Sequence, residues 1–262
     1  MINNALSVQG MLPYLKYDIS ENIRIYDCLE STNKTAKKPE FSCAEHGTII
    51  IAETQTAGKG RYGKSFHSPP DSGLYITFIL HPEKLNFTTP TLITAFAAVA
   101  VCETIEATCC KTPQIKWVND IFVNDKKICG ILTESVNTPE NKTHTILGIG
   151  INITDPPTGF PPEIQSTAGS LFGTSKTTIT RNRLTAELIN HILFTDDLFD
   201  EKMMLTKYKQ RMFLLGKTIK VNDGDDSYEA TALDIDDFGH LVVKTLKNKL
   251  VYLSTGEVSI II

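Results

Sequence analysis

The stretch "GKGRYGKS", residues 58–65, decides between two fold classes. It satisfies the phosphate-loop pattern G-x-x-x-x-G-K-[ST] letter by letter, but such a loop needs a buried strand before its glycines and a helix that begins at the Lys-Ser pair. Upstream, the β-branched run "GTIIIAETQ" (47–55) predicts the strand. Downstream, Pro69 and Pro70 exclude a helix, and "GLYITFIL" (73–80) predicts a second strand. The loop therefore joins strand to strand, which disfavours a nucleotide triphosphatase.

The loop itself has the composition of an anion site. Its glycines alternate with Lys59, Arg61 and Lys64, so the backbone is flexible and the surrounding charge is positive. A solvated basic loop is the alternative reading of the same glycines and charges. The choice between the two depends on the rest of the chain.

Composition limits the class of protein. The 262 residues, of which 41% are hydrophobic, suffice for one large domain with a small appendage or for two domains. The formal net charge of −4 argues against general nucleic-acid binding. The longest apolar run, residues 92–102, is too short to span a bilayer, and no secretory signal opens the chain. The six cysteines show no C-x-x-C spacing, so neither a zinc site nor a disulfide framework is indicated. We expect a soluble cytoplasmic protein.

The predicted elements indicate an α+β protein with two parts. Residues 1–22 contain no periodic element, a short helix follows a capping turn at "STN", and a buried helix is expected over 91–107. Asn124-Asp125 is a hairpin turn between two strands, and one long amphipathic helix is expected over 180–203. After about residue 213 the pattern changes to short strands. The expected division is therefore an α+β domain at 1–212 and an all-β module at 213–262, with seven acidic residues and no Lys or Arg between Val221 and Val243.

Four segments stand in a fixed order and together resemble biotin–protein ligases, the enzymes that attach biotin to a lysine of biotin-dependent carboxylases. They are "STN" (31–33), "ETQTAGKGRYGKSFHSP" (53–69), "KWVNDIFVNDKKICGILTE" (116–134) and "GIGIN" (148–152). The resemblance runs over nearly the whole chain, including the terminal "GEVSI". It implies a mixed β-sheet flanked by helices, of the type found in class II aminoacyl-tRNA synthetases, and a small C-terminal β-barrel.

The resemblance also implies a reaction in two steps, with ATP and Mg²⁺ as cofactors and biotin as substrate. Biotin is first joined to ATP as biotinyl-5′-AMP, so two anions must approach each other, and fixed cations and backbone N–H groups lower that barrier. The lysine ε-amine of a biotin carboxyl carrier domain then attacks the acyl carbonyl and AMP departs. No cysteine nucleophile is needed.

Residues that match the family's biotin site come from three of the segments. Ser31, Thr32, Asn33 and Gln55 match the family positions that hydrogen-bond the ureido ring. The alternative is a purely structural role, as helix caps for Ser31 and Asn33 and as an amide at a strand end for Gln55. Lys127 matches the lysine that holds the carboxylate and the α-phosphate, although a surface lysine of a hairpin is the alternative. The expected biotin-binding residues are Ser31, Thr32, Asn33, Gln55, Lys59, Gly60, Arg61, Lys127 and Gly130.

The expected nucleotide site overlaps the basic loop. By resemblance, this loop folds over biotin and the adenylate, and the glycines of "GIGIN" let the ligand lie against a strand. Trp117 is expected to pack behind the site rather than to contact the ligand. The expected ATP and adenylate contacts are Gly58, Lys59, Gly60, Arg61, Lys64, Lys116, Asn119 and Asn152.

Arg61, Asp120 and Lys127 are the expected catalytic residues. Asp120 would bind Mg²⁺ or orient the attacking amine, whereas an Asx turn between strands is the alternative. The chain departs from the family at Lys59 and Tyr62, where arginines are common, and at Phe66, where tryptophan is frequent. Loss of a guanidinium gives up bidentate phosphate geometry, so the affinity for nucleotide is expected to differ from the family's.

The resemblance leaves three rival functions. A lipoate–protein ligase shares the chemistry, a non-catalytic biotin-binding protein shares the site, and a DNA-binding repressor shares the catalytic domain. About 22 residues precede the catalytic pattern, so we expect a ligase without the winged helix-turn-helix domain. The expected partner is a biotin carboxyl carrier domain, with no nucleic acid and no membrane, and the protein is expected to be a monomer or a homodimer.

Overall fold

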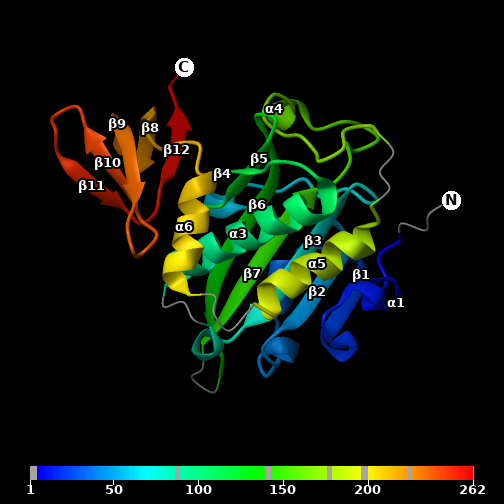
Figure 1. Ribbon diagram of the computed structural model, residues 1–262. Coiled ribbons are helices and arrows are strands. Elements are labelled where there is room, and N and C mark those ends of the chain that lie inside the picture. The colour runs from blue at the N-terminus through cyan, green and yellow to red at the C-terminus, as the bar shows by residue number, and fades with distance from the viewer. Residues whose placement is uncertain are drawn as a thin grey trace.

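The computed structural model describes residues 5–85, 89–139, 143–175, 179–195, 200–223 and 226–261. Its larger part is built on a mixed seven-stranded sheet (Figure 1). The strand order is β1-β2-β3-β7-β6-β5-β4, in which β1 and β2 are parallel and the other pairs are antiparallel. The strands are β1 (Ile23–Leu29), β2 (Thr48–Gln55), β3 (Gly73–Leu80), β4 (Gln114–Lys116), β5 (Asp120–Val123), β6 (Lys126–Asn137) and β7 (Thr143–Asn152).

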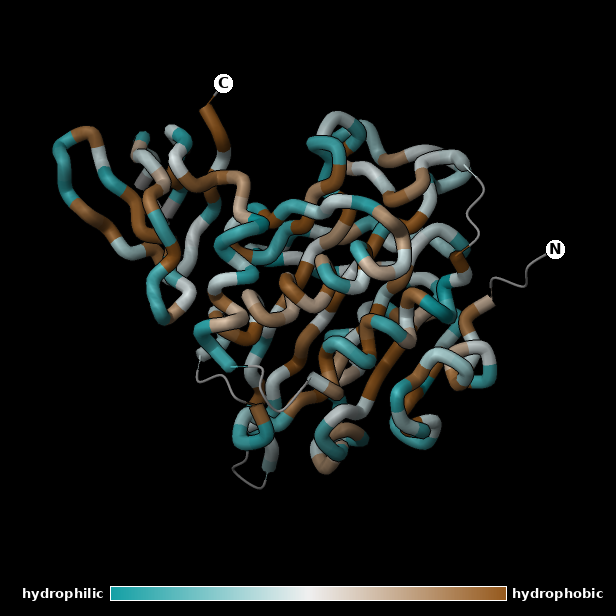
Figure 2. Tube along the Cα trace, in the orientation of Figure 1, coloured by the Kyte–Doolittle hydropathy of each residue, from teal (hydrophilic) through white to brown (hydrophobic). Residues whose placement is uncertain are grey.

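Helices cover one face of this sheet. The covering helices α3 (Pro90–Cys109), α5 (Arg181–Leu193) and α6 (Glu201–Arg211) lie in front of the strands in Figure 1. Hydrophobic residues run through the central strands and α3, while the connections are hydrophilic (Figure 2). The sheet is therefore buried through its centre, and every residue of β3 is buried rather than every second one.

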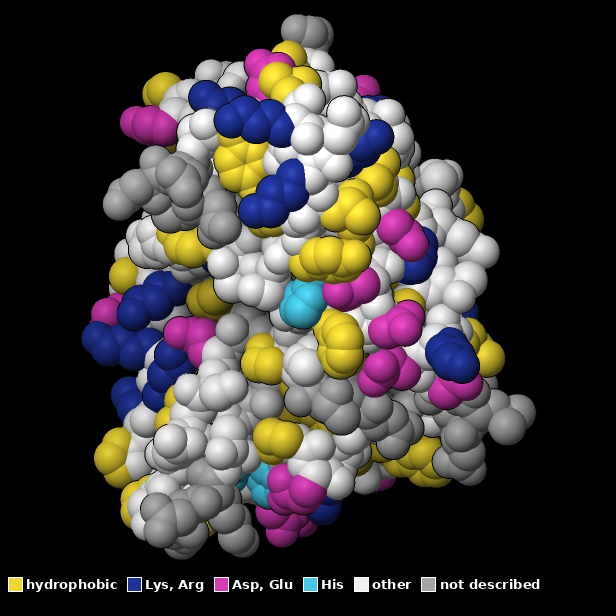
Figure 3. All heavy atoms as spheres, turned by 90° about the vertical axis from the view of Figure 1, so that its left-hand side faces the viewer, with side chains coloured by type: hydrophobic (Ala, Val, Ile, Leu, Met, Phe, Trp, Pro, Cys, Tyr) yellow, Lys and Arg dark blue, Asp and Glu magenta, His cyan; other side chains and the backbone are white. Residues whose placement is uncertain are grey.

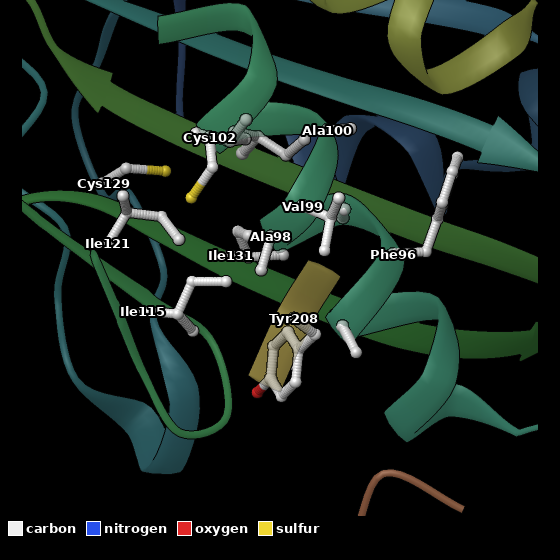
Figure 4. Packing of buried hydrophobic residues seen from close by; sticks show 14 of the residues in the cluster. Phe96, Ala98, Val99, Ala100, Cys102, Ile115, Ile121, Cys129, Ile131 and Tyr208 are labelled. Atoms are coloured by element: carbon white, nitrogen blue, oxygen red, sulfur yellow. The ribbon is translucent and has the colours of Figure 1, made fainter. Parts of the chain in front are cut away.

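The buried helix expected over 91–107 is confirmed as α3, which Thr89 caps by accepting a hydrogen bond from the Leu92 N–H. Its Ala98 and Cys102 lie toward Ile131 and Cys129 of the sheet, and Tyr208 of α6 closes the cluster (Figure 4). Among the described residues α3 is the one helix long and apolar enough to cross a membrane, and 83% of its apolar window is buried inside the fold. That burial is typical of a core helix.

The loop and the hairpin form as the sequence predicts. Residues 58–65 lie in the connection from β2 to β3, and a hydrogen bond from the Gly60 N–H to the Lys64 carbonyl at 2.7 Å closes the loop. It contains one short 3-10 helix, η4 (Arg61–Gly63), and no α-helix begins at Lys64 and Ser65. Asn124 and Asp125 both adopt positive φ, at 51° and 59°, as a two-residue turn between β5 and β6 requires. The phosphate-loop fold is thereby excluded.

Two sequence expectations are wrong. Residues 1–22 are not featureless, because α1 (Val8–Met11) packs on α5 and buries Met11 completely. The segment expected to be one long helix is two, since α5 ends at Leu193 and Asp200 caps the start of α6 by accepting from the Met203 N–H. Side-chain capping thus overrides the amphipathic pattern that runs through both helices.

The C-terminal module is a separate antiparallel sheet of five strands, in the order β11-β10-β9-β8-β12. The expected small all-β module is confirmed, and in the described residues no pairing is recorded between its edge strands β11 and β12. Hydrophobic and basic side chains are interspersed over the face of the molecule that carries this module (Figure 3). The strands are β8 (Thr218–Asp223), β9 (Asp226–Ile235), β10 (Leu241–Thr245), β11 (Leu250–Leu253) and β12 (Glu257–Ile260).

Candidate active site

A cavity of about 550 Å³ opens where the basic loop, the β5–β6 hairpin, β7 and the start of β12 meet. The structure brings almost every predicted site residue to its wall, although these residues come from distant parts of the chain. Gly58 does not line it. The predicted residues on the wall are Ser31, Thr32, Asn33, Gln55, Lys59, Gly60, Arg61, Lys64, Lys116, Asn119, Asp120, Lys127, Gly130 and Asn152.

The inner end of the cavity is polar and uncharged at its surface. Gln55 Oε1 accepts hydrogen bonds from the Thr32 N–H at 2.8 Å and the Thr32 hydroxyl at 3.1 Å. The Thr77 hydroxyl lies 2.7 Å from Asn33 Oδ1. Ser31 caps the short helix α2 (Thr32–Ala36), so helix capping and a place on the cavity wall occur together. These groups are held rigidly, and a ligand here has to match their hydrogen-bonding directions.

The middle of the cavity is cationic. Lys127 Nζ lies 2.7 Å from Asp120 Oδ1 in an ion pair, although this buried oxygen accepts no well-aligned hydrogen bond. Lys116 lies on the same wall, and burial lowers the pKa of its ammonium, an effect that the charge of Asp120 opposes. Two lysines beside one carboxylate leave net positive charge, which suits a bound anion.

The basic loop covers the outer end of the cavity. Arg61 donates to Asn119 Oδ1 at 3.2 Å and to the Tyr62 hydroxyl at 3.0 Å. Lys64 reaches the C-terminal sheet, where its Nζ lies 2.5 Å from Glu257 Oε1. The loop is thus tied to the second module, and Gly256, Glu257, Val258 and Ser259 complete the cavity wall.

Asn119, Asn152 and Gly58, three of the predicted nucleotide contacts, also have structural roles in or near the site. Asn119 Nδ2 donates to the Ile131 carbonyl at 2.8 Å, and its Oδ1 holds Arg61. Asn152 Nδ2 donates to the Gly169 carbonyl at 2.9 Å. Gly58 lies at the base of the loop, where a Cβ would come within 2.4 Å of the Phe66 carbonyl oxygen. Gly58 is therefore needed for close packing at the base of the loop.

An aromatic side chain forms the apolar wall. The Phe66 ring lies against β7, so a Cβ on Gly150 would approach its Cε1 to 2.5 Å, and one on Gly130 would lie 3.3 Å from its Cε2. Trp117 is buried and donates from Nε1 to the Gly239 carbonyl of the C-terminal module at 3.1 Å. It packs behind the site as expected, but one side of the residue also reaches the cavity wall.

Sequence reasoning missed several contributors. Thr77 and Glu134 lie behind Asn33, and only pairing across the sheet brings them there. His67 lines the cavity, and its buried Nε2 has no hydrogen-bond partner in the described part of the chain. The "FHS" letters carry no motif that could have identified this residue.

The site fits a metal ion that arrives with its ligand better than a resident metal. In the described ranges no group of three or more His, Cys, Asp or Glu side chains could hold an ion. Asp120 offers one carboxylate beside the cationic part of the cavity. Mg²⁺ is commonly bound through one or two carboxylates together with substrate phosphates, so Asp120 fits this role when a nucleotide supplies the other ligands.

Fold and cavity together offer polar uncharged groups and a cluster of cations on one wall, beneath a cationic loop. A family model described as "Biotin/lipoate A/B protein ligase family" matches residues 25–152, and one described as "Biotin protein ligase C terminal domain" matches residues 214–260. Bifunctional ligase/repressor BirA of Bacillus subtilis is 34% identical over 234 residues, which cover 87% of this chain and 70% of that protein. The chain belongs to the biotin protein ligase family.

Two further comparisons agree with this assignment. Biotin--[acetyl-CoA-carboxylase] ligase of Mycobacterium tuberculosis is 25% identical, over 81% of this chain and 78% of that protein. The structure of a biotin protein ligase from Aquifex aeolicus in complex with biotin and ATP superimposes with a TM-score of 0.77 at 24% identity, covering 92% of this chain and 99% of that one. The mixed sheet with its separate C-terminal sheet is therefore the fold of these ligases.

Proposed function

We propose that the protein activates biotin with ATP to biotinyl-5′-AMP and transfers the biotinyl group to a lysine of a biotin carboxyl carrier domain. The observation that carries this proposal is that one cavity gathers the polar groups of Thr32, Asn33 and Gln55, a cluster of two lysines beside Asp120, and the basic loop. These three kinds of group suit a ureido ring, a carboxylate and an adenylate. The ligase relatives, which include biotin--[acetyl-CoA-carboxylase] ligase, support the same assignment.

The polar inner end favours biotin over lipoate. Thr32, Asn33, Gln55 and Thr77 are buried or partly buried polar groups. A ureido ring can add hydrogen bonds to the remaining donor and acceptor capacity of these groups, whereas a dithiolane ring offers no comparable donor or acceptor. Sites built around hydrogen bonds reject ligands that lack the matching groups far more strongly than apolar pockets reject an extra methylene.

The first step needs positive charge where two anions meet. Lys127 and Lys116 line the middle of the cavity, and we assign them to the biotin carboxylate and the α-phosphate, with Arg61, Lys59 and Lys64 contributing from the loop. The biotin carboxylate oxygen attacks the α-phosphorus, and pyrophosphate departs. Mg²⁺ would neutralise phosphate charge, with Asp120 as its protein ligand.

The second step needs a deprotonated amine held at the acyl carbon. Asp120 is the carboxylate next to Lys127, so we assign it to orienting the incoming ε-amine and accepting its proton. The attack forms the amide bond and releases AMP. We further propose that residues 1–212 and 213–262 are separate domains, that the protein works in the cytoplasm, and that it binds no nucleic acid.

The test measures both half-reactions with purified protein, Mg-ATP and either biotin or lipoate. We expect biotin-dependent release of pyrophosphate, and AMP that appears only when a carrier domain is added. Turnover with lipoate but not biotin would reassign the chain to the lipoate branch of the family. Absence of turnover with both would contradict an enzymatic role.

A further inference from the structure

An ion pair lies behind the inner end of the cavity, outside its wall. Lys37 Nζ of the chain segment after α2 lies 2.5 Å from Glu134 Oε1 of β6. The other carboxylate oxygen, Oε2, accepts a hydrogen bond from Asn33 Nδ2 at 2.9 Å. Partial burial raises the pKa of Glu134, but the hydrogen bonds from Lys37 and Asn33 outweigh it and hold the pKa below its ordinary value. Glu134 is therefore ionised at neutral pH and can only accept hydrogen bonds.

This arrangement determines which way the Asn33 amide points. Glu134 Oε2 and the Leu132 carbonyl, at 2.9 Å and 3.4 Å from Asn33 Nδ2, are both acceptors, so the NH₂ group has to face them. On the other side, the hydroxyl of the fully buried Thr77 lies 2.7 Å from Asn33 Oδ1. A flipped amide would place its carbonyl oxygen against a carboxylate in a buried site, which is costly.

The strand β7 packs so closely against the Asn33 side chain that only this orientation of the amide is accommodated. Asn33 Oδ1 lies so close to β7 that a Cβ on Gly148 would approach it to 2.1 Å. Asn33 is 4% exposed, and both Asn33 and Gly148 line the cavity. With its NH₂ group committed to Glu134, Asn33 offers the cavity an acceptor, and a ligand group at this place has to donate an N–H.

We propose that Glu134 is a positioning residue that fixes the Asn33 amide with its oxygen toward the cavity, and thereby makes the inner end selective for ligands with a ring N–H. The inference rests on the proposed function, because the ureido ring of biotin supplies that donor. The role of Lys37 is secondary, since a partly exposed ion pair contributes little energy and the acceptors of Asn33 remain without it.

The variant Glu134→Gln tests the proposal. The glutamine side chain keeps the shape of glutamate but can turn its NH₂ group toward Asn33, and the Asn33 amide can then flip so that its oxygen accepts from that group. We expect KM for biotin to rise by about 10- to 100-fold, the effect of one misdirected buried hydrogen bond. The kcat at saturating biotin and the KM for ATP should stay within about twofold of the wild-type values. The lost interaction stabilises bound biotin equally in the ground state and the transition state, so its loss affects biotin binding alone. Desthiobiotin, which keeps both ring N–H groups, should lose affinity in parallel.

Two control variants separate positioning from charge. Glu30→Gln removes the carboxylate of a surface pair with Lys34, at 2.6 Å, and should leave KM for biotin unchanged. Lys37→Met leaves both acceptors of Asn33 in place and should raise KM by less than about threefold. If Glu134→Gln does not fold, Thr77→Val tests the same orientation from the opposite side and should also raise KM for biotin.

The outcomes are distinguishable from failure of the proposed function. Wild-type protein without biotin-dependent pyrophosphate release would refute the function itself. An active wild type with an unchanged biotin KM in Glu134→Gln would refute the positioning role alone. A parallel rise of KM for ATP and biotin, or an equal loss in Lys37→Met, would also overturn it, because either result points to general disruption or to charge.

Discussion

The Tyr62 hydroxyl accepts a hydrogen bond from the Gly256 backbone N–H at 2.8 Å, across the junction between the basic loop and the C-terminal sheet. The same oxygen accepts from Arg61 at 3.0 Å, and the guanidinium lies 4.9 Å from the Tyr62 ring centroid. The ion pair between Lys64 and Glu257 forms a second link nearby. Tyr62 therefore couples the position of Arg61 to the second module.

Tyr62→Phe should weaken nucleotide binding while leaving biotin binding intact. The phenyl ring keeps its stacking on Arg61, but both hydrogen bonds to the hydroxyl are lost, so we expect KM for ATP to rise by about 3- to 20-fold. Steady-state kinetics with each substrate varied in turn measure the split. Tyr252→Phe, at an exposed tyrosine of β11, is the matched control, and an equal effect there would contradict the coupling.

Asp120→Asn should impair chemistry more than binding. The amide cannot accept the amine proton and no longer neutralises Lys127, so we expect turnover with carrier domain to fall by at least about 100-fold, with biotin affinity retained. Single-turnover transfer from preformed biotinyl-5′-AMP isolates this step. The control is Glu103→Gln on α3, which removes a carboxylate whose Oε1 lies 2.7 Å from Lys207 Nζ in a comparable ion pair. This variant should leave turnover unchanged. Full transfer activity in Asp120→Asn would remove Asp120 from the mechanism.

Gly150→Ala should displace the Phe66 ring and with it the base of the basic loop. Because the added Cβ would come within 2.5 Å of that ring, we expect a loss of stability of about 1–3 kcal/mol and weaker binding of both substrates. Thermal unfolding and substrate KM values measure the two effects. Combination with Phe66→Leu should restore part of the loss, and the absence of any recovery would show that the ring is not the obstacle.

His46 should make the protein less stable in mild acid. Burial and then the charge of His81 lower the pKa of His46 to about 4, and its Nδ1 accepts a hydrogen bond from the His81 N–H at 3.0 Å. The unfolded chain binds this proton at about pH 6.5 but the folded chain does not, so stability falls as pH drops from about 6.5 to 4. His46→Asn keeps an acceptor without titrating, and should reduce that fall by on the order of 1 kcal/mol, because partial exposure weakens the effect.

Denaturant unfolding at neutral pH and at about pH 5 measures the difference. The substitution should change stability little at neutral pH, where His46 is uncharged in both states. An identical loss of stability in wild type and variant between the two pH values would exclude His46 as the responsible group.

Local chemistry in the sequence predicted much of the fold. The prolines after the basic loop excluded a helix, and Asn124-Asp125 specified the hairpin turn, because both constrain the backbone directly. These signals act within a few residues, so they do not depend on tertiary contacts. The residues of the cavity wall were predicted through the resemblance of four short segments to biotin–protein ligases, because local chemistry alone left helix caps and surface lysines as alternatives.

The remaining features depend on pairing between distant segments. Glu134 reaches Asn33 only because β6 pairs with β7 at the register that places Leu132 opposite Gly148. The N-terminal segment is ordered by two asparagines of α5, since Asn182 and Asn190 bond with the backbone of Ser7 and Lys16. The contribution of β12 to the cavity depends on the packing of one sheet beside another, which no local pattern encodes.

The uniformly apolar helix α3 has a consequence for synthesis of the chain on the ribosome. Its partners α5 and α6 begin at Arg181 and Glu201, so most of its burial becomes possible only after the later strands and these helices have emerged. At about 5–20 residues per second, this segment stays uncovered for several seconds. We expect chaperones that capture apolar segments to bind it during that time, so that the yield of folded protein in a cell depends on them.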